Sequence, residues 1–389
     1  MRMPENEQEL KYSRLREAMR GDNADACLIS LNIHHYYFTG EVFNGYLYIT
    51  TESGPCYFLI RPSGPDAENR YNIRKPEEIP GILAGLGISL PRRLWLEADE
   101  LPYSAYVRLK HIFRPESEGN ASAAFRQLRM IKTPWEIRQL RHSARQHEAV
   151  YREIPACYRP GMTDLELQIA VENRMRQHGS IGHFRAFGAN MDIFMGSLLA
   201  GENAGTPSPF DFALGGAGMH ASTPIGANGT VLAEGMSVMV DMSGNYTAYM
   251  TDMTRVFSVG KLKDEAYAAH RVALEMENWL EEQARPGMIC SDIYGYALET
   301  ARQAGWGENF MGTRLQARFV GHGVGLQINE LPVLAPRCDT PLQPGMVFAF
   351  EPKFVLPGTG AVGIENTWLV TEGGVEKLTC LPEEIIPLS

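Results

Sequence analysis

Four acidic residues and one histidine in the C-terminal part of this 389-residue chain could together bind divalent metal ions. Asp241 and Glu351 each end an apolar run, VMVD and FAFE, and each is followed by a second acid, Asp252 or Glu365. His322 lies between two glycines in GHGVGLQINELP. Carboxylates that converge repel one another, by about 4 kcal/mol per pair at ~4 Å and an effective dielectric of about 20, so a cation would have to accompany them. Several oxygens with one imidazole suit Mn, Co, Fe or Zn better than a closed structural zinc site.

These acids belong to an internal repeat, which is the main reason to expect them at one place. In each copy the first acid follows the glycine of a Gly-Met pair by six residues, and a threonine, Thr254 or Thr367, follows the second acid by two. The repeated motifs are Arg-Pro-Gly-Met at 159–162 and 285–288 and Gly-Met at 235–236 and 345–346. A duplicated α/β unit folded about a pseudo-twofold axis would bring the four carboxylates to its centre.

Each acid taken alone has a simpler explanation. An acid at the end of an apolar strand is costly to bury unpaired, and Arg255, Lys353 or backbone amides could pair with these acids. Likewise, a lone histidine in a glycine-rich stretch is more often structural than metal-binding. The full order Asp, Asp, His, Glu, Glu, together with the repeat, favours metal binding.

Composition and charge exclude several classes of protein. The chain has 36 Lys and Arg against 46 Asp and Glu, a net charge of −10, so no basic field would hold a nucleic acid. Its longest uncharged stretch, 212–233, is rich in glycine and unlike the ~20 apolar residues of a membrane span. The charged N-terminus lacks the apolar core of a secretion signal, which predicts a cytoplasmic protein. The six cysteines form no C-x-x-C pair and are expected to be reduced.

The order of apolar and polar segments predicts two α/β domains, over 1–124 and 125–389. Apolar runs at 25–30, 46–50, 56–60 and 93–98 alternate with polar or helical segments, and the small and polar residues at 114–125 suggest a linker. Beyond it, helical periodicity marks 132–154, 163–179, 262–283 and 291–304, and strand patterns cover 233–244, 250–260, 344–354 and 364–371. His270, on the 262–283 helix, is expected at the surface.

The strings DMSGNYTAYMTDMTRVFSVG, GHGVGLQINELP and FEPKFVLPGTGAVGIENTWLVT resemble the M24 metallopeptidase family, which has the pita-bread fold. The resemblance covers about 127–389, and the first 120 residues look like the N-terminal domain of the prolidase, aminopeptidase P and creatinase branch. It implies a pita-bread domain of two pseudo-twofold halves, preceded by a smaller α/β domain. It also implies a hydrolase that cleaves a peptide or related amide bond near an N-terminus, with a preference for Xaa-Pro.

The resemblance further implies specific roles for residues. Asp241, Asp252, His322, Glu351 and Glu365 would hold two divalent ions, Mn, Co, Zn or Fe, with Asp252 and Glu365 bridging them. Glu351 would take a proton from the attacking water and pass it to the leaving nitrogen. His220, in GGAGMHASTP, would steady the substrate, or would be a loop histidine bonded to backbone. Such relatives are commonly dimers, in which His34, His35 and Tyr36 would line the partner's pocket.

The chain departs from this family's pattern at two places. Asn329 stands where these peptidases carry a second histidine, and an asparagine can hydrogen-bond an oxyanion or carbonyl but cannot titrate. Gly363 stands where an arginine usually precedes the last glutamate by two residues, which disfavours a strict dipeptidase unless Arg185 or Lys353 substitutes. The segment 182–212, rich in glycine and aromatics, is a candidate pocket loop.

Besides a peptidase, the sequence leaves two other functions open. The departures at Asn329 and Gly363 would suit a creatinase-like or lyase-like relative acting on a small metabolite, although creatinases have lost metal ligands that this chain keeps. A catalytically silent binding module is a third possibility, disfavoured because all five ligands are present. A Ser-His-Asp hydrolase is weakly supported, since no G-x-S-x-G occurs.

Overall fold

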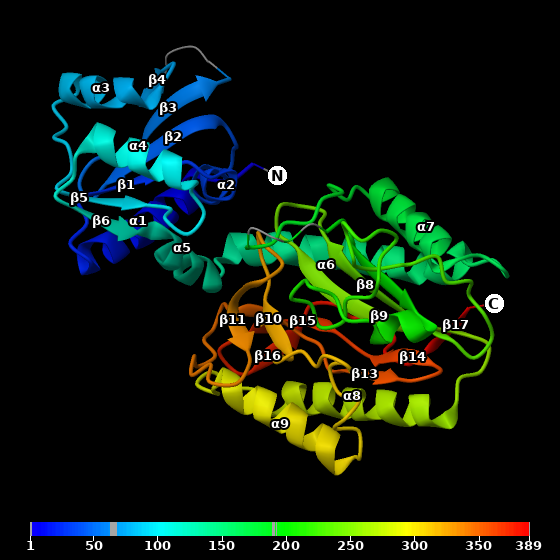
Figure 1. Ribbon diagram of the computed structural model, residues 1–389. Helices are drawn as coiled ribbons and strands as arrows, with labels where there is room; N and C mark the ends of the chain where they lie inside the picture. The colour runs from blue at the N-terminus through cyan, green and yellow to red at the C-terminus, as the bar shows by residue number, and fades with distance from the viewer. Residues whose placement is uncertain (1, 63–67, 189–190, 192, 389) are drawn as a thin grey trace. The chain divides into compact units, whose positions relative to one another are not determined.

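The computed structural model describes residues 2–62, 68–188, 191 and 193–388. They divide into two compact units, Met1–Arg129 and Met130–Ser389, which run from blue to cyan and from cyan-green to red in Figure 1. No helix of the described ranges is long and apolar enough to cross a membrane. All six cysteines are free, as expected.

The N-terminal unit is built on a six-stranded mixed sheet in the order β4-β3-β2-β1-β5-β6. The four apolar runs seen in the sequence form β1, β2, β3 and β5, and β1 is antiparallel to β2 and parallel to β5. Residues of α3 and α4 pack on the sheet and bury its apolar face. The elements are α1 (Glu5–Gly21), β1 (Ala26–Ile29), α2 (Asn32–Thr39), β2 (Asn44–Thr50), β3 (Cys56–Arg61), β4 (Arg70–Asn72), η1 (Pro76–Glu78), α3 (Ile79–Gly85), β5 (Arg93–Leu96), α4 (Tyr103–Phe113), β6 (Ser117–Asn120) and α5 (Ala121–Met130).

The linker expected over 114–125 is wrong, because these residues form β6 and the first half of α5. Strand β6 pairs in parallel with β5 at the edge of the sheet. The small residues that suggested a linker serve close packing instead: a Cβ on Gly119 would lie 2.3 Å from the ring of Trp95. The compact units divide after Arg129 rather than at the expected position near 125.

The C-terminal unit contains two sheets and a β-hairpin between two pairs of helices (Figure 1). Helices α6 and α7 contact the sheet β17-β9-β8-β7, and α8 and α9 contact the sheet β11-β10-β12-β15-β16 and the hairpin β13-β14. The elements are α6 (Pro134–Cys157), α7 (Asp164–Gln177), β7 (Gly196–Ala200), η2 (Gly201–Gly205), β8 (Ser237–Gly244), β9 (Thr251–Val259), α8 (Asp264–Gln283), α9 (Cys290–Gln303), β10 (Gly321–Gly323), β11 (Glu330–Leu334), β12 (Val347–Phe350), β13 (Lys353–Leu356), β14 (Gly360–Gly363), β15 (Asn366–Val370), β16 (Val375–Lys377) and β17 (Ile386–Leu388).

Matching backbone geometry confirms the internal repeat. Gly161 and Gly287, the glycines of the two Arg-Pro-Gly-Met motifs, have φ of 84° and 94°. Gly235 and Gly345, the glycines of the two Gly-Met pairs, have φ of 85° and 90°. These left-handed conformations favour glycine, so each copy makes the same turn before a helix and before the strand that leads to its first acid.

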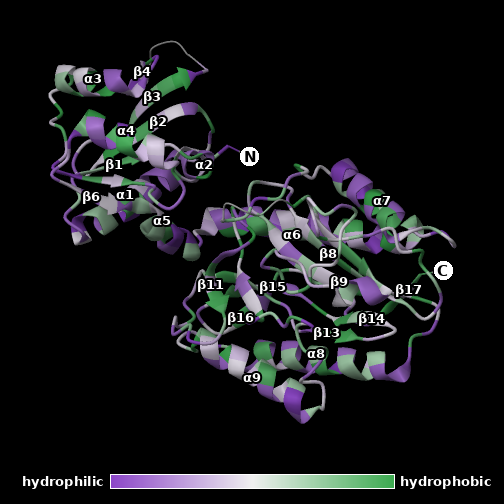
Figure 2. Ribbon diagram, viewed as in Figure 1, coloured by the Kyte–Doolittle hydropathy of each residue, from purple (hydrophilic) through white to green (hydrophobic). Residues whose placement is uncertain are grey.

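The helices form where the sequence pattern placed them, and their buried faces explain one wrong expectation. Helices α6 and α7 each begin with a capping box, Thr133 with Glu136 and Thr163 with Glu166. Figure 2 shows hydrophobic and hydrophilic residues alternating around the long helices. His270 was expected at the surface of α8 but is buried, because it lies on the face that also buries Ala266, Ala269, Ala273 and Glu277.

Candidate metal centre and substrate pocket

The antiparallel pair β8 and β9 presents two of the acids on one face. Asp241 lies opposite Thr254, and Asp252 lies opposite Ser243. Residues directly opposite each other, and residues two apart on one strand, share a face of a sheet. The two carboxylates therefore point to the same side although eleven residues separate them in sequence.

Strand β10 brings His322 to the same place from the second sheet. The flanking glycines permit the close approach of neighbouring strands: a Cβ on Gly321 would lie 2.2 Å from the carbonyl oxygen of Ala349, and one on Gly323 would lie 2.1 Å from that of Leu331. The Nδ1 of His322 is 3.2 Å from the carbonyl oxygen of Gly323 and can donate to it. This contact favours the tautomer whose Nε2 keeps a lone pair for a metal ion.

The remaining acids flank the strands of the second half. Glu351 follows β12 directly, and its amide donates to the carbonyl oxygen of Val320 at 2.9 Å. Glu365 precedes β15 and exchanges two backbone hydrogen bonds of 3.3 Å with Thr254 of β9. The two halves of the repeat thus meet directly at the acids.

The repeated threonines cross between the halves and hold the acids in place. The hydroxyl of Thr254 donates to Glu365 Oε2 at 2.6 Å. The hydroxyl of Thr367 donates to the carbonyl oxygen of Asp252 at 2.8 Å and accepts from its amide at 2.9 Å. Each threonine follows the second acid of its own copy and bonds the second acid of the other copy, as a pseudo-twofold arrangement requires.

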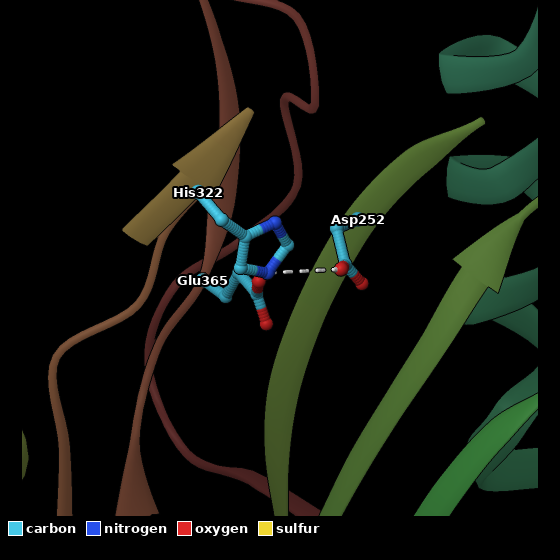
Figure 3. Close-up of side chains that lie close together, drawn as sticks. All are labelled: Asp252, His322 and Glu365. Carbon is cyan, nitrogen blue, oxygen red and sulfur yellow. Dashed lines mark ion pairs between the residues drawn. The ribbon is translucent and has the colours of Figure 1, made fainter. Parts of the chain in front are cut away.

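The five predicted ligands form two overlapping groups. Asp252, His322 and Glu365 make one group, and Asp241, Glu351 and Glu365 make the other; in each, one ligand atom per residue lies within 4.8 Å of the others. Figure 3 shows the first group, with Asp252 and His322 pointing toward each other from strands of different sheets, β9 and β10; His322 Nε2 is 3.8 Å from Asp252 Oδ2. The same nitrogen is 3.5 Å from Glu351 Oε1.

The second group already holds a cation, the ammonium of Lys353. Its Nζ lies 2.7 Å from Glu351 Oε2, 2.9 Å from Asp241 Oδ2 and 3.0 Å from Glu365 Oε2. Lys353 has no exposed surface. The simpler explanation of the acids, pairing with a neighbouring base, therefore holds for this group, whereas Arg255 donates to the carbonyl oxygens of Thr254 and Glu365 and not to their side chains.

Burial dominates the electrostatics of the site. It raises the pKa of Glu365 to about 8 and the pKa of Asp252 well above its usual range, and the neighbouring carboxylates raise the pKa of Asp252 further. Burial alone would lower the pKa of Lys353, but the charges of Asp241, Glu351 and Glu365 outweigh it and raise that pKa well above its usual value. The lysine is therefore an ammonium at neutral pH.

A pocket opens above these residues and has mainly apolar walls. All five predicted ligands line it, as do Ser197, Ser243, Asp211 and Asn329. Its apolar lining comes from Phe184, Met191, Ile193, Ala213, Phe212, Ile225, Phe319 and Ile328. Residues of the 182–212 segment thus form part of the wall, as expected; residues 189, 190 and 192 of that segment lie outside the described part of the chain.

Two further predicted residues lie elsewhere or make other contacts. His220 is exposed and is not among the described residues that line the pocket; its Nδ1 pairs with the hydroxyl of Ser222 at 2.8 Å and accepts from the amide of Ser222 at 3.1 Å within a tight turn. These contacts favour the loop histidine bonded to backbone, and a role beside the substrate stays a prediction. Asn329 lines the pocket, but its amide is engaged: Oδ1 accepts from the amide of Phe187 at 2.7 Å, and Nδ2 donates to that residue's carbonyl oxygen at 3.0 Å. Asn329 thus anchors the wall loop rather than pointing a free amide at a substrate.

The two adjacent histidines of α2 lie in the interior of the N-terminal unit. His34 and His35 are both buried within their own unit. His34 Nδ1 lies 2.6 Å from Glu97 Oε1, and the ring nitrogens of His35 pair with the carbonyl oxygens of Phe43 and Ile29 at 3.1 Å. The expectation that these two residues line a partner's pocket is wrong, since both are buried and their rings pack on Phe125 and Phe43. For Tyr36 it stays a prediction.

From the sequence, Lys353 was expected only as an alternative partner of the acids, and its central position was not predicted. A signal existed, because residues two apart on an extended chain share a face, and Lys353 is two residues from Glu351 in a strand whose other members are apolar. A lysine inside such a strand needs a buried partner.

The comparisons with known proteins agree with this geometry. Residues 138–372, more than half of the chain, match the model of metallopeptidase family M24, and residues 11–131 match the creatinase/prolidase N-terminal domain. The chain therefore belongs to metallopeptidase family M24. The expected pita-bread architecture with a smaller N-terminal α/β domain is confirmed.

Several proteins that are similar along almost the whole chain are named as peptidases. The chain is 26% identical to a Xaa-Pro dipeptidase of Pyrococcus horikoshii, over 97% of this chain and 98% of the relative. It is 26% identical to the solved structure of a Xaa-Pro dipeptidase from Bacillus anthracis, covering 98% and 100% of the two chains with a TM-score of 0.80. An X-Pro aminopeptidase structure from Thermotoga maritima, 24% identical with a TM-score of 0.78 over 97% and 99%, shows the same fold. The peptidase interpretation is thus favoured over the creatinase-like alternative.

Proposed function

We propose that this protein is a metal-dependent peptidase that cleaves the bond before a proline near the N-terminus of a peptide. The observation that carries the proposal is the group Asp252, His322 and Glu365 at the floor of an apolar pocket, with ligand atoms close enough to share one ion. The proposed preference for Xaa-Pro bonds rests on similarity to two proteins that are named as Xaa-Pro dipeptidases.

The ligand atoms support a divalent ion in the first group. Glu365 Oε1 is buried and has no hydrogen-bond partner among the described residues, while Nε2 of His322 is left available by the Nδ1 contact. A buried carboxylate oxygen without a partner is costly unless it binds a cation. Two ions, of Mn, Co, Zn or Fe, stay a prediction from the family resemblance, and the second group supports a metal less well because it holds Lys353.

Glu351 is the residue that we assign to proton transfer. Its Oε2 accepts from Lys353, whereas its Oε1 is buried without a hydrogen-bond partner in the described structure and lies 3.5 Å from His322 Nε2. A divalent ion supplies Lewis acidity, which polarises the scissile carbonyl and acidifies a water. Glu351 would accept the proton of that water and return it to the leaving nitrogen, a role worth about 10²–10⁴ in rate.

The pocket walls fit a proline better than a charged residue. Phe184, Phe212 and Ile193 offer apolar surface to a pyrrolidine ring. The described lining includes no Lys or Arg that could form an ion pair with the C-terminal carboxylate of a dipeptide. Asp211, which lies outside the ligand cluster in the described lining, could bind the α-ammonium of a peptide. These features favour an aminopeptidase acting on longer peptides over a strict dipeptidase.

Homodimerisation and a cytoplasmic location stay predictions from the sequence. The buried state of His34 and His35 removes one argument for a shared active site but does not bear on association itself. Light scattering coupled to size-exclusion chromatography measures the mass in solution against the 43.4 kDa of one chain.

The test is a matched peptide panel with metal-loaded protein. We expect cleavage of Ala-Pro-Ala-Ala and little cleavage of Ala-Ala-Ala-Ala or of the dipeptide Ala-Pro. Glu351→Gln is expected to lose at least a hundredfold in kcat, whereas Glu275→Gln, an exposed acid on α8, serves as the matched control and keeps the rate. Equal cleavage of all peptides would refute the Xaa-Pro preference, and no cleavage by any metal-loaded sample would refute the peptidase proposal.

A further inference from the structure

Lys353 places an ammonium among the residues that the family resemblance assigns to two metal ions. We propose that its ammonium takes the cation position of the Asp241, Glu351 and Glu365 group, so that this chain holds one tightly bound divalent ion, at Asp252, His322 and Glu365. The proposal rests on the proposed function for the identity of the site, but it concerns how many ions that site takes.

The contacts of the ammonium are complete. An ammonium has three donors and no acceptor, and Lys353 Nζ meets three different carboxylates at 2.7, 2.9 and 3.0 Å. Lys353 is wholly buried and does not line the pocket, so neither water nor substrate reaches it. The group Asp241, Glu351 and Glu365 is therefore neutralised in part without any metal.

An ion at the centre of the same three oxygens would compete with the ammonium. Metal–oxygen distances in such sites are about 2.0–2.2 Å, shorter than the three contacts of Nζ, so an ion bound by these atoms would fall within contact of the nitrogen. Two cations so close repel strongly in a buried site. The ammonium therefore prevents the binding of a second ion at these oxygens or lowers its affinity.

The oxygens of Glu365 divide between the two groups. Oε2 accepts from both Thr254 and Lys353, at 2.6 and 3.0 Å. Oε1 has no hydrogen-bond partner in the described structure, although Glu365 is 1% exposed. Because Oε1 is the oxygen of Glu365 left without a hydrogen bond, we place the single ion at the group that Glu365 forms with Asp252 and His322.

The neighbouring strand makes room for the lysine. Lys353 of β13 lies opposite Gly363 of β14, and a Cβ on Gly363 would come within 2.7 Å of the Lys353 Cα. Gly363 also stands where the family resemblance would place an arginine. The cation missing from one strand of the hairpin is thus supplied by the residue directly across from it.

The experiment counts ions on the intact chain. Metal-free protein is incubated with excess Mn²⁺, desalted, and its manganese measured by inductively coupled plasma mass spectrometry against protein concentration. We expect about one ion per chain for the wild type and about two for Lys353→Ala, with the second ion bound at least tenfold more tightly than by the wild type. Lys377→Ala, which removes a lysine bonded to Glu383 outside the cluster, should keep one ion.

The electron paramagnetic resonance spectrum of the wild type gives a second readout that needs no folded variant. A single Mn²⁺ gives an isolated six-line signal, and a close pair gives an exchange-coupled spectrum. Two tightly bound, coupled ions in the wild type would overturn the inference while leaving the peptidase proposal intact. No bound ion would overturn both, and a single ion in both wild type and a folded Lys353→Ala would show that the lysine does not limit the count.

Discussion

The hydroxyl of Thr254 is expected to set the metal affinity of the site, because it fixes the orientation of Glu365. It donates to Glu365 Oε2 at 2.6 Å, and both residues are almost wholly buried. A hydrogen bond to a charged group contributes about 1.5–3 kcal/mol. Since about 1.4 kcal/mol corresponds to tenfold in an equilibrium constant, Thr254→Val should weaken metal binding by about 10- to 100-fold, as is typical when a partner of a ligand is removed.

The assay is competition for Mn²⁺ or Zn²⁺ against a fluorescent chelator, with urea unfolding of the same metal-free samples. Thr379→Val is the matched control, because Thr379 is equally buried and its hydroxyl bonds Asn366 and the amide of Thr367 but no cluster carboxylate. It should lose stability and keep its metal affinity within about threefold. If Thr254→Val binds metal as the wild type does, Glu365 is not held by this contact and the geometric argument for the site is wrong.

Three other outcomes follow from single contacts. Burial raises the pKa of Glu277 to about 8, so between pH 5 and 8 the folded chain keeps a proton on Glu277 that the unfolded chain has lost. The free energy of unfolding, measured with urea, should therefore fall by up to about 1.4 kcal/mol per pH unit over this range. Glu277→Gln should remove this pH dependence. An unchanged slope would argue against the buried proton. Asn329→Ala frees the loop that carries Phe187, so steady-state kinetics should show a KM several-fold higher with kcat nearly unchanged; a selective loss of kcat would instead support a catalytic amide. Asp211→Asn should raise KM for peptides with a free α-amino group and leave that for N-acetylated peptides unchanged, and equal effects on both would remove Asp211 from ammonium binding.

The repeat made much of the site predictable from sequence. The spacing of Asp241 and Asp252 fits a hairpin of two strands that share a face, and the structure forms that hairpin as β8 and β9. The paired threonines were visible as a pattern, although only the fold shows that Thr254 reaches across to Glu365. A duplicated sequence predicts that the acids of the two copies lie close together, because both copies fold with the same local geometry.

Contacts that depend on the course of a loop or on a neighbouring strand were not predictable in the same way. His220 lies in a turn that closes on Ser222, and no periodicity reports where such a turn points. The spacing of two residues from Glu351 could have indicated the side to which Lys353 points, but the order of residues does not show that Gly363 lies opposite it across the hairpin. His270 was a different case, since the helical spacing of buried positions on α8 would have placed it inward.

The most direct test of the whole account is hydrolysis of Ala-Pro-Ala-Ala in ¹⁸O-labelled water, followed by mass spectrometry, with protein that has been stripped of metal and then reloaded. We expect one ¹⁸O to enter the carboxylate of the released alanine, stripping to abolish the reaction and reloading to restore it. Glu351→Gln should release no labelled alanine above background. Absence of labelled alanine from the reloaded wild type, or undiminished cleavage by the stripped protein, would contradict the assignment of this cluster as a metal-dependent peptidase site.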